Sequence, residues 1–340
     1  MTTPPYSVVF AGDELSSRLQ SVLPGFVVRV ANRSQLESAA LRASVVFVGA
    51  DRVDQLIGGP IDIPIVAIVD CEPSDTFANT IGTLASCPSV CHILTASLLF
   101  SPRAHTHLAA LLERFVAGPD HLLIGGRGVA RVALLASSEK RSARLARMDE
   151  FFSKHNVSER TVSTILDVSE ELVMNALYDA PSESGYFSRP RQRLENVELP
   201  VELACEICYG VEDEMVFVRV RDHFGSLSRA RLIEVLARCN SQSVALDESR
   251  GGAGLGLWRV FSAASMISIT VTQERLTDVV VGIATTKQGR GYAKQLQALH
   301  LFFGPQSEDY EMLSITSDDD DYALSNHGVL DESVTLVCVA

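Results

Sequence analysis

Three short segments, far apart in the chain, carry residue types and spacings that suit the binding of a phosphate-bearing ligand. In the first, Glu171 and Asn175 lie four residues apart in a stretch with helical apolar spacing, so both face one side. An amide oxygen and a carboxylate held this way can bind Mg²⁺ and poise a water or hydroxyl for proton removal. Taken alone, the pair fits a solvated helix face equally well.

The second segment places a carboxylate at the end of an expected strand. Met215–Val220 alternates between apolar and polar positions, and Asp222 and Gly225 follow it. A carboxylate there can accept a hydrogen bond from the exocyclic amine of adenine, and the glycine allows a sharp turn.

The third segment is a glycine-rich run that opens an expected helix ending near Ala264. Its glycines, from Gly251 to Gly256, would let backbone N–H groups and the positive helix end approach phosphates. Without a ligand, the same run is a flexible loop before a helix. Its GxGxG spacing, with no strand directly before it, disfavours a dinucleotide-binding fingerprint.

In this order, the three segments resemble the GHKL superfamily of ATP-binding domains, which includes gyrase, heat-shock chaperones, histidine kinases and MutL. Glu171 and Asn175 match its N box, Asp222 and Gly225 its first glycine box, and Gly252–Leu257 its second. The glycine of the first box stands one residue late. The resemblance implies ATP and Mg²⁺ as ligands, with Asn175 holding the metal and Glu171 acting as catalytic base. It also implies nucleotide contacts from Asn175, Asp222, Gly225, Arg250, Gly252, Gly254, Leu255 and Gly256.

The region before the N box separates the branches of this superfamily. Only His155 lies where a histidine kinase carries its phospho-acceptor, and no acid follows it. The stretch from Met148 to Glu159 resembles the anti-sigma-factor serine kinases instead. The resemblance implies an ATP-binding signalling regulator that phosphorylates or sequesters a protein partner. A non-catalytic nucleotide-sensing or docking scaffold is the alternative, favoured by the altered first glycine box, so enzymatic activity stays open.

The elements that position these segments indicate an α/β sandwich with a mixed, mainly antiparallel sheet, as in Bergerat-type ATPases. Helices are expected before the N box and after the second glycine box. We assign this ATP-binding domain to residues 148–286. Its strands are expected at Val201–Tyr209, Met215–Val220, Ile267–Gln273 and Val279–Ala284.

Residues 1–118 alternate apolar strand-like runs with helix-like segments, which predicts a doubly wound, parallel five-strand sheet. Size and order resemble the receiver domain of two-component signalling. Asp51, however, follows the third strand too late for a phosphate acceptor, and Thr95–Ser97 lacks the family's lysine. Asp13 either belongs to an acidic Mg²⁺ pair with Glu14 or caps the first helix. We therefore predict a pseudoreceiver-like docking domain. Its strands are expected at 7–10, 26–30, 44–48, 63–69 and 90–94, and its helices at 13–23, 33–42, 74–86 and 102–116.

Two further regions complete the chain. Residues 119–147 are expected to form a connector with a glycine turn and a charged helix. Residues 287–340 form an acidic C-terminal extension, with a helix over Gly291–His300, a solvated acidic loop over Ser314–Asp321 and an added strand over Glu332–Val339.

Composition limits the partners of the chain. Its 340 residues include 29 Lys and Arg against 42 Asp and Glu, a net charge of −13, which argues against nucleic acid. No apolar run approaches the roughly 18 residues of a membrane span. Seven scattered cysteines suit reduced thiols and hence a cytoplasmic location. A homodimer is compatible with the sequence.

Overall fold

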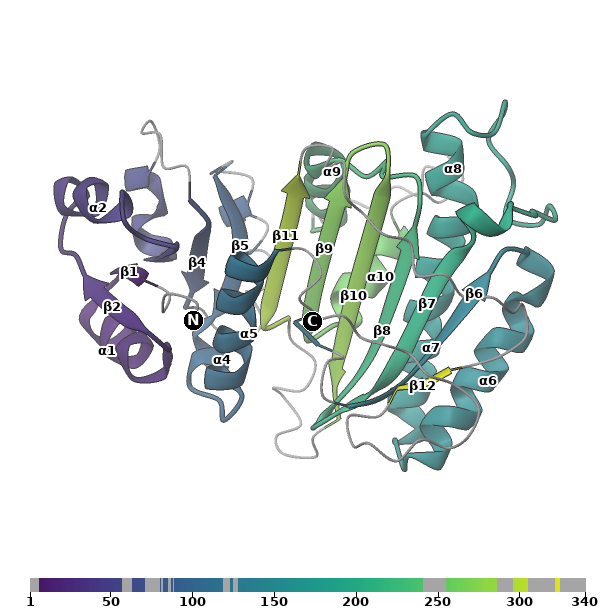
Figure 1. The fold of residues 1–340 in the computed structure, drawn as a ribbon, viewed down its shortest axis with the longest axis horizontal. Coiled ribbons are helices and arrows are strands. Elements are labelled where there is room, and N and C mark those ends of the chain that lie inside the picture. The colour runs from purple at the N-terminus through teal and green to yellow at the C-terminus, as the bar shows by residue number, and fades with distance from the viewer. Residues whose placement is uncertain are drawn as a thin grey trace. The chain divides into compact units, whose positions relative to one another are not determined.

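The computed structural model has an α/β architecture whose strands pair both parallel and antiparallel (Figure 1). Its contacts divide the chain into two compact units: unit 1 contains Met1–Leu123 and Gln295–Leu301, and unit 2 contains Ile124–Lys294 and Phe302–Val339. The structure describes residues 6–56, 63–70, 80, 82–84, 87, 89–118, 123–124, 128–240, 255–285, 296–304 and 322–324.

Unit 1 is built on parallel strands in the order β2-β1-β3-β4-β5. All residues of β3 and β4 are buried, as expected for a parallel sheet covered on both faces. The five predicted strands are present within two residues of their predicted ends. The elements are β1 (Tyr6–Phe10), α1 (Asp13–Val22), β2 (Phe26–Arg29), α2 (Arg33–Ala40), β3 (Val45–Gly49), η1 (Ala50–Leu56), β4 (Ile65–Val69), β5 (Val90–Thr95), α4 (Ala96–Leu99), α5 (Ala104–Ala117) and β11 (Ala298–Gly304).

The strand β11 comes from the C-terminal region and pairs antiparallel with β5, Ala298 opposite Leu94. The helix predicted over residues 291–300 is therefore wrong over 296–300, and 291–295 lie outside the described residues. Burial explains the difference: Leu299 and Leu301 are almost fully buried, and strand pairing satisfies their backbone groups. The expected acidic loop and the expected strand over Glu332–Val339 lie outside the described residues.

Three histidines gather in the interior of unit 1. His107 Nε2 lies 3.0 Å from His300 Nε2, and the His92 ring centroid lies 5.5 Å from that of His300. Burial is the main cause that lowers the pKa of His92 to about 3 and of His107 to about 4, with Arg114 and Arg103 adding to it. The cluster is therefore neutral at physiological pH.

The structure also places the acidic residues that the sequence analysis considered in unit 1. Asp13 begins α1, but Gly12 occupies the cap position, and Asp13 is a fully exposed partner of Arg29 at 2.7 Å. Asp51 lies in η1, two residues after β3 ends, and pairs with Arg52. Of the helix predicted at 74–86, residues 80 and 82–84 are described and are helical.

Unit 2 has a sheet in the order β12-β6-β7-β8-β10-β9, and the pairings among these described strands are antiparallel. The predicted strand at Val201–Tyr209 starts late, because Pro200 opens the 3₁₀ turn η4 and pairing begins at Cys205. Part of the expected connector forms β6. The elements are β6 (Val129–Leu135), η2 (Ser138–Lys140), α6 (Arg141–Lys154), α7 (Glu159–Met174), η3 (Asn175–Asp179), α8 (Ala180–Glu183), η4 (Val201–Leu203), β7 (Cys205–Glu212), β8 (Met215–Asp222), α9 (Arg229–Asn240), α10 (Leu255–Ala263), β9 (Met266–Thr272), β10 (Leu276–Ala284) and β12 (Tyr322–Leu324).

The helix α7 packs on the sheet against β8 and β10, with α6 and α10 on the same side (Figure 1). The Ser158 side chain caps its first turn by accepting a hydrogen bond from the Thr161 N–H. At its C-terminal end the helix widens into one π turn, η3, before α8 continues. Such turns are rare inside α-helices and often occur at functional sites. No helix among the described residues is long and apolar enough to cross a bilayer.

Candidate functional site

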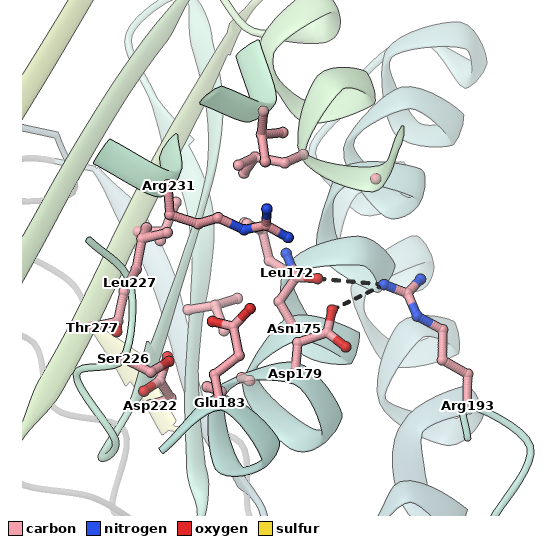
Figure 2. A pocket seen from close by; sticks show the side chains of 17 residues that line it. Leu172, Asn175, Asp179, Glu183, Arg193, Asp222, Ser226, Leu227, Arg231 and Thr277 are labelled. Carbon is pink, nitrogen blue, oxygen red and sulfur yellow. Dashed lines mark hydrogen bonds and ion pairs between the residues drawn. The ribbon is translucent and has the colours of Figure 1, made fainter. Parts of the chain in front are cut away.

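A cavity in unit 2 lies between the α7–η3–α8 helix and the strands β8 and β10 (Figure 2). Counted out to its open mouth, it contains about 830 Å³ of space that no atom fills. Apolar side chains, among them Leu172, Val220 and Val279, line it together with a small set of charged groups.

The first charged group is Asp222, the last residue of β8. Its carboxylate is buried and accepts hydrogen bonds from the backbone N–H groups of Phe224, at 2.9 Å, and Gly225, at 3.4 Å. Burial raises its pKa to about 7, although these hydrogen bonds and the Thr277 hydroxyl act in the opposite direction. These protein donors offset part of the cost of burying the carboxylate.

Two glycines, Gly225 and Gly256, lie where the backbone comes too close to its neighbours for a side chain. Gly225 has φ of +57°, and a Cβ there would overlap the carbonyl oxygen of Thr272. It therefore allows the turn that directs two N–H groups at Asp222. Gly256, in the first turn of α10, has no room for a Cβ because the Glu171 carboxylate lies against it.

Acceptor side chains follow one face of the helix at four-residue spacing, from Glu171 through Asn175 to Asp179. All three bind one guanidinium: Arg193 lies 3.1 Å from Glu171 Oε2, 3.4 Å from Asn175 Oδ1 and 3.2 Å from Asp179 Oδ2. Figure 2 shows Arg193 entering from the side opposite Asp222. The π turn begins at Asn175 and ends at Asp179, so it sets the spacing between two of these acceptors.

Further charges complete the cavity wall. Burial raises the pKa of Asp179 against the opposing effect of Arg193, and burial raises that of Glu183 against Arg231. Arg231 projects from α9 across the cavity toward Asn175, while Asp222, Glu183 and Asp179 lie on the other side (Figure 2). The cavity therefore contains both carboxylates and arginines.

The structure brings together residues from all three segments singled out in the sequence. Asn175, Asp222 and Gly256 line this one cavity. Glu171 lies just behind the wall, against Arg193 and Gly256. Gly225 does not line the cavity, but its N–H group donates a hydrogen bond to Asp222, which does. Leu255 begins α10, and Arg250, Gly252 and Gly254 lie outside the described residues.

Several cavity residues were not predicted. Asp179 and Glu183 continue the four-residue spacing of Glu171 and Asn175, so the sequence contained a signal for them. Arg193 comes from an irregular segment eighteen residues after Asn175, as the numbering shows, and no periodic pattern places it. Ser226 and Arg231 follow the first glycine box and become identifiable only once the turn at Gly225 is known.

The residues present fit a purine nucleotide with a divalent cation. Asp222 and Thr277, from β8 and β10, offer polar atoms at the cavity wall, as an adenine edge requires. The oxygens that converge on Arg193 are of the kind that Mg²⁺ prefers. Asn175, Glu171 and Asp179 would hold that ion, which supplies charge neutralisation for phosphates when bound.

No protein-family model matches the chain, and no curated protein matches it. Among solved structures, the chain is similar to a chain in the crystal structure of the SiaB–SiaC complex from Pseudomonas aeruginosa. The TM-score is 0.34 and the sequence identity 14%, over 45% of this chain and 88% of that chain. The site assignment therefore depends on the residues of the cavity itself.

Proposed function

We propose that unit 2 is an ATP-binding domain of the GHKL type and that the protein is a signalling regulator acting on a protein partner. One observation carries the proposal: Asn175, Asp222 and Gly256, from three distant segments, line one cavity. Independent packing of three unrelated segments would have no reason to gather an amide, a buried carboxylate and a bare helix start.

In this proposal the adenine amine donates to Asp222, whose buried carboxylate lines the cavity and has acceptor capacity beyond its bonds to the Phe224 and Gly225 N–H groups. The phosphates extend toward the first turn of α10, whose backbone N–H groups face an anion favourably. Arg250, Gly252, Gly254 and Leu255 are proposed to complete the phosphate site. Mg²⁺ would be held by Asn175.

A second candidate is a non-catalytic nucleotide-sensing or docking scaffold, and the state of Glu171 favours it. A general base needs a free carboxylate within reach of the hydroxyl it activates. Glu171 is instead paired with Arg193 at 3.1 Å and with Arg259 at 3.8 Å. In either case we propose that unit 1 is a receiver-like docking module that does not accept phosphate at Asp51.

Calorimetric titration of ATP in the presence of Mg²⁺ tests nucleotide binding. Wild-type protein is expected to bind with a sub-millimolar Kd. Asp222→Asn should weaken binding roughly 10- to 100-fold, because loss of a buried charged acceptor costs on the order of 1–3 kcal/mol. Asp167→Asn, on the exposed side of α7, is the matched control and should bind as wild type. Undetectable heat with wild-type protein would overturn the proposal.

Chemistry is tested separately by phosphate release and by transfer of labelled phosphate to a partner. If Glu171 acts as base, Glu171→Gln should lose turnover while retaining ATP binding. Equal phosphate release from both proteins would exclude that role, whereas no release or transfer by wild-type protein that binds ATP would support the scaffold.

A further inference from the structure

The place that suits a divalent cation in unit 2 already contains a positive charge. The Arg193 guanidinium contacts all three oxygen-bearing side chains there, Glu171, Asn175 and Asp179. Burial works to lower the pKa of Arg193, but Asp179 and Glu171 outweigh it and raise the pKa. The charge is thus held by two carboxylates and an amide oxygen, which are hard oxygen ligands.

The backbone that carries Arg193 is anchored by other residues. Glu195 binds Arg189 and Arg191 and accepts from the Gln192 N–H, while its carbonyl accepts from the Tyr178 hydroxyl at 2.7 Å. The Arg193 side chain is about one-third exposed, and its neighbour Leu194 is almost fully exposed. The side chain can therefore leave the cavity by changing rotamers while the segment stays in place.

Arg193 and a divalent ion cannot use the same oxygens together. An ion bound to Asn175 and its two carboxylate neighbours would lie within a few ångströms of the guanidinium, and like charges at that separation repel strongly in a partly buried site. Each cation therefore excludes the other.

We propose that Arg193 is a tethered cation that fills the divalent-metal position of the empty cavity and must swing out before Mg²⁺ and nucleotide phosphates bind there. The inference rests on the proposed ATP site and adds its regulation. The same movement removes the closer of the two arginines that pair with Glu171 and leaves Arg259, at 3.8 Å. Arg193 thus determines when the metal can enter and when Glu171 can exchange this ion pair for the metal.

The test measures metal binding without turnover. Mn²⁺ binding is followed by electron paramagnetic resonance, and Mg²⁺ binding by calorimetry, in the absence of nucleotide. Arg193→Met keeps the length and apolar stem but removes the charge, so divalent affinity should rise at least tenfold. Arg160→Met, at an exposed arginine in the first turn of α7, is the matched control and should leave affinity unchanged. Equal divalent affinity in wild type and Arg193→Met would overturn the inference.

A measurement on wild-type protein covers the case in which the variant fails to fold. Specific labelling of arginine side chains allows the Arg193 Nε–H to be followed by NMR. Added Mg²⁺ with ADP should shift this signal and speed guanidinium rotation, since the three acceptors are lost. An unchanged signal at saturating ligand would contradict the inference.

Failure of the two proposals can be told apart by ADP titration in EDTA. If ADP binds but Arg193→Met does not change the divalent affinity, only the tethered-cation inference fails. If ADP and ATP bind to neither protein, with or without metal, the proposed function itself fails.

Discussion

Both units bury ionisable side chains, but they do so in opposite ways. In unit 1, His92, His107 and His300 pack against one another and are neutral because burial lowers their pKa values. In unit 2, Asp222 faces an open cavity, and burial raises its pKa to about 7. Burial alone therefore does not identify a site. What distinguishes unit 2 is that its buried group faces space that a ligand can fill.

The two clusters also give the units opposite responses to pH. The histidine pKa values in the folded chain lie below the unfolded value near 6.5, so the unfolded chain takes up protons first as pH falls. That stability is present above pH 6.5 and is lost as pH falls toward 4. For Asp222 the folded pKa exceeds the unfolded value, so stability is lost as pH rises from about 4 through 7.

The largest expected effect is acid destabilisation of unit 1. At pH 5, each histidine with a folded pKa near 3 or 4 should remove about 2 kcal/mol relative to pH 7, hence about 4 kcal/mol for His92 and His107. Hydrogen exchange of β5 and α5, corrected for intrinsic rates, measures it. His92→Leu should reduce the pH dependence, whereas His105→Gln, whose ring bonds to the Val22 carbonyl instead, should retain it. Equal hydrogen-exchange protection of β5 and α5 at pH 5 and pH 7 would show that the histidines do not give unit 1 a pH response opposite to that of unit 2.

A smaller effect concerns the turn that positions Asp222. Gly225→Ala should destabilise unit 2 by about 2–3 kcal/mol, since it adds a left-handed backbone penalty to a clash with the Thr272 carbonyl. Urea unfolding followed by the fluorescence of Trp258, the only tryptophan, reports on this unit. Gly185→Ala is the control: its φ is +79° but its surroundings are open, so about 1 kcal/mol is expected. Similar losses in both variants would show that the contact at Gly225 is unimportant.

The smallest effect is the pH dependence of unit 2 itself. Asp222→Asn should remove a decline in stability of at most about 1.4 kcal/mol per pH unit between pH 5 and 7. The same urea unfolding, repeated at pH 5, 6, 7 and 8, measures the slope. Asp167→Asn should leave the slope as it is in wild type. A wild-type stability that rises over this interval would contradict the sign derived for Asp222.

Regular periodicity explains which parts of the fold could be predicted. The valine-rich runs of β3 and β4 allow little besides buried strands, and they lie within two residues of their predicted ends. The local sequence pattern predicted a helix where β11 forms, because pairing with β5 determines the conformation of Ala298–His300. It also failed at Val201–Leu203, where Pro200 delays the strand.

In the candidate site, too, residues within local motifs could be predicted, and a residue placed by tertiary contacts could not. Asn175, Asp222 and Gly256 were found because each belongs to a short motif with a local physical reason. Arg193 was not, because its position depends on how an irregular segment is anchored through Glu195. Long-range contacts of that kind leave no spacing rule in the sequence.

The pairing of β11 with β5 has a consequence for how the protein is made. Residues that complete the N-terminal sheet and its histidine cluster are separated from it in sequence by Ile124–Lys294 of unit 2. During synthesis on the ribosome, the exposed edge of β5 must wait for roughly two hundred further residues to emerge. The N-terminal part of unit 1 is thus translated first but can complete its sheet only late. An exposed strand edge can pair with other chains, so a chaperone would be needed there.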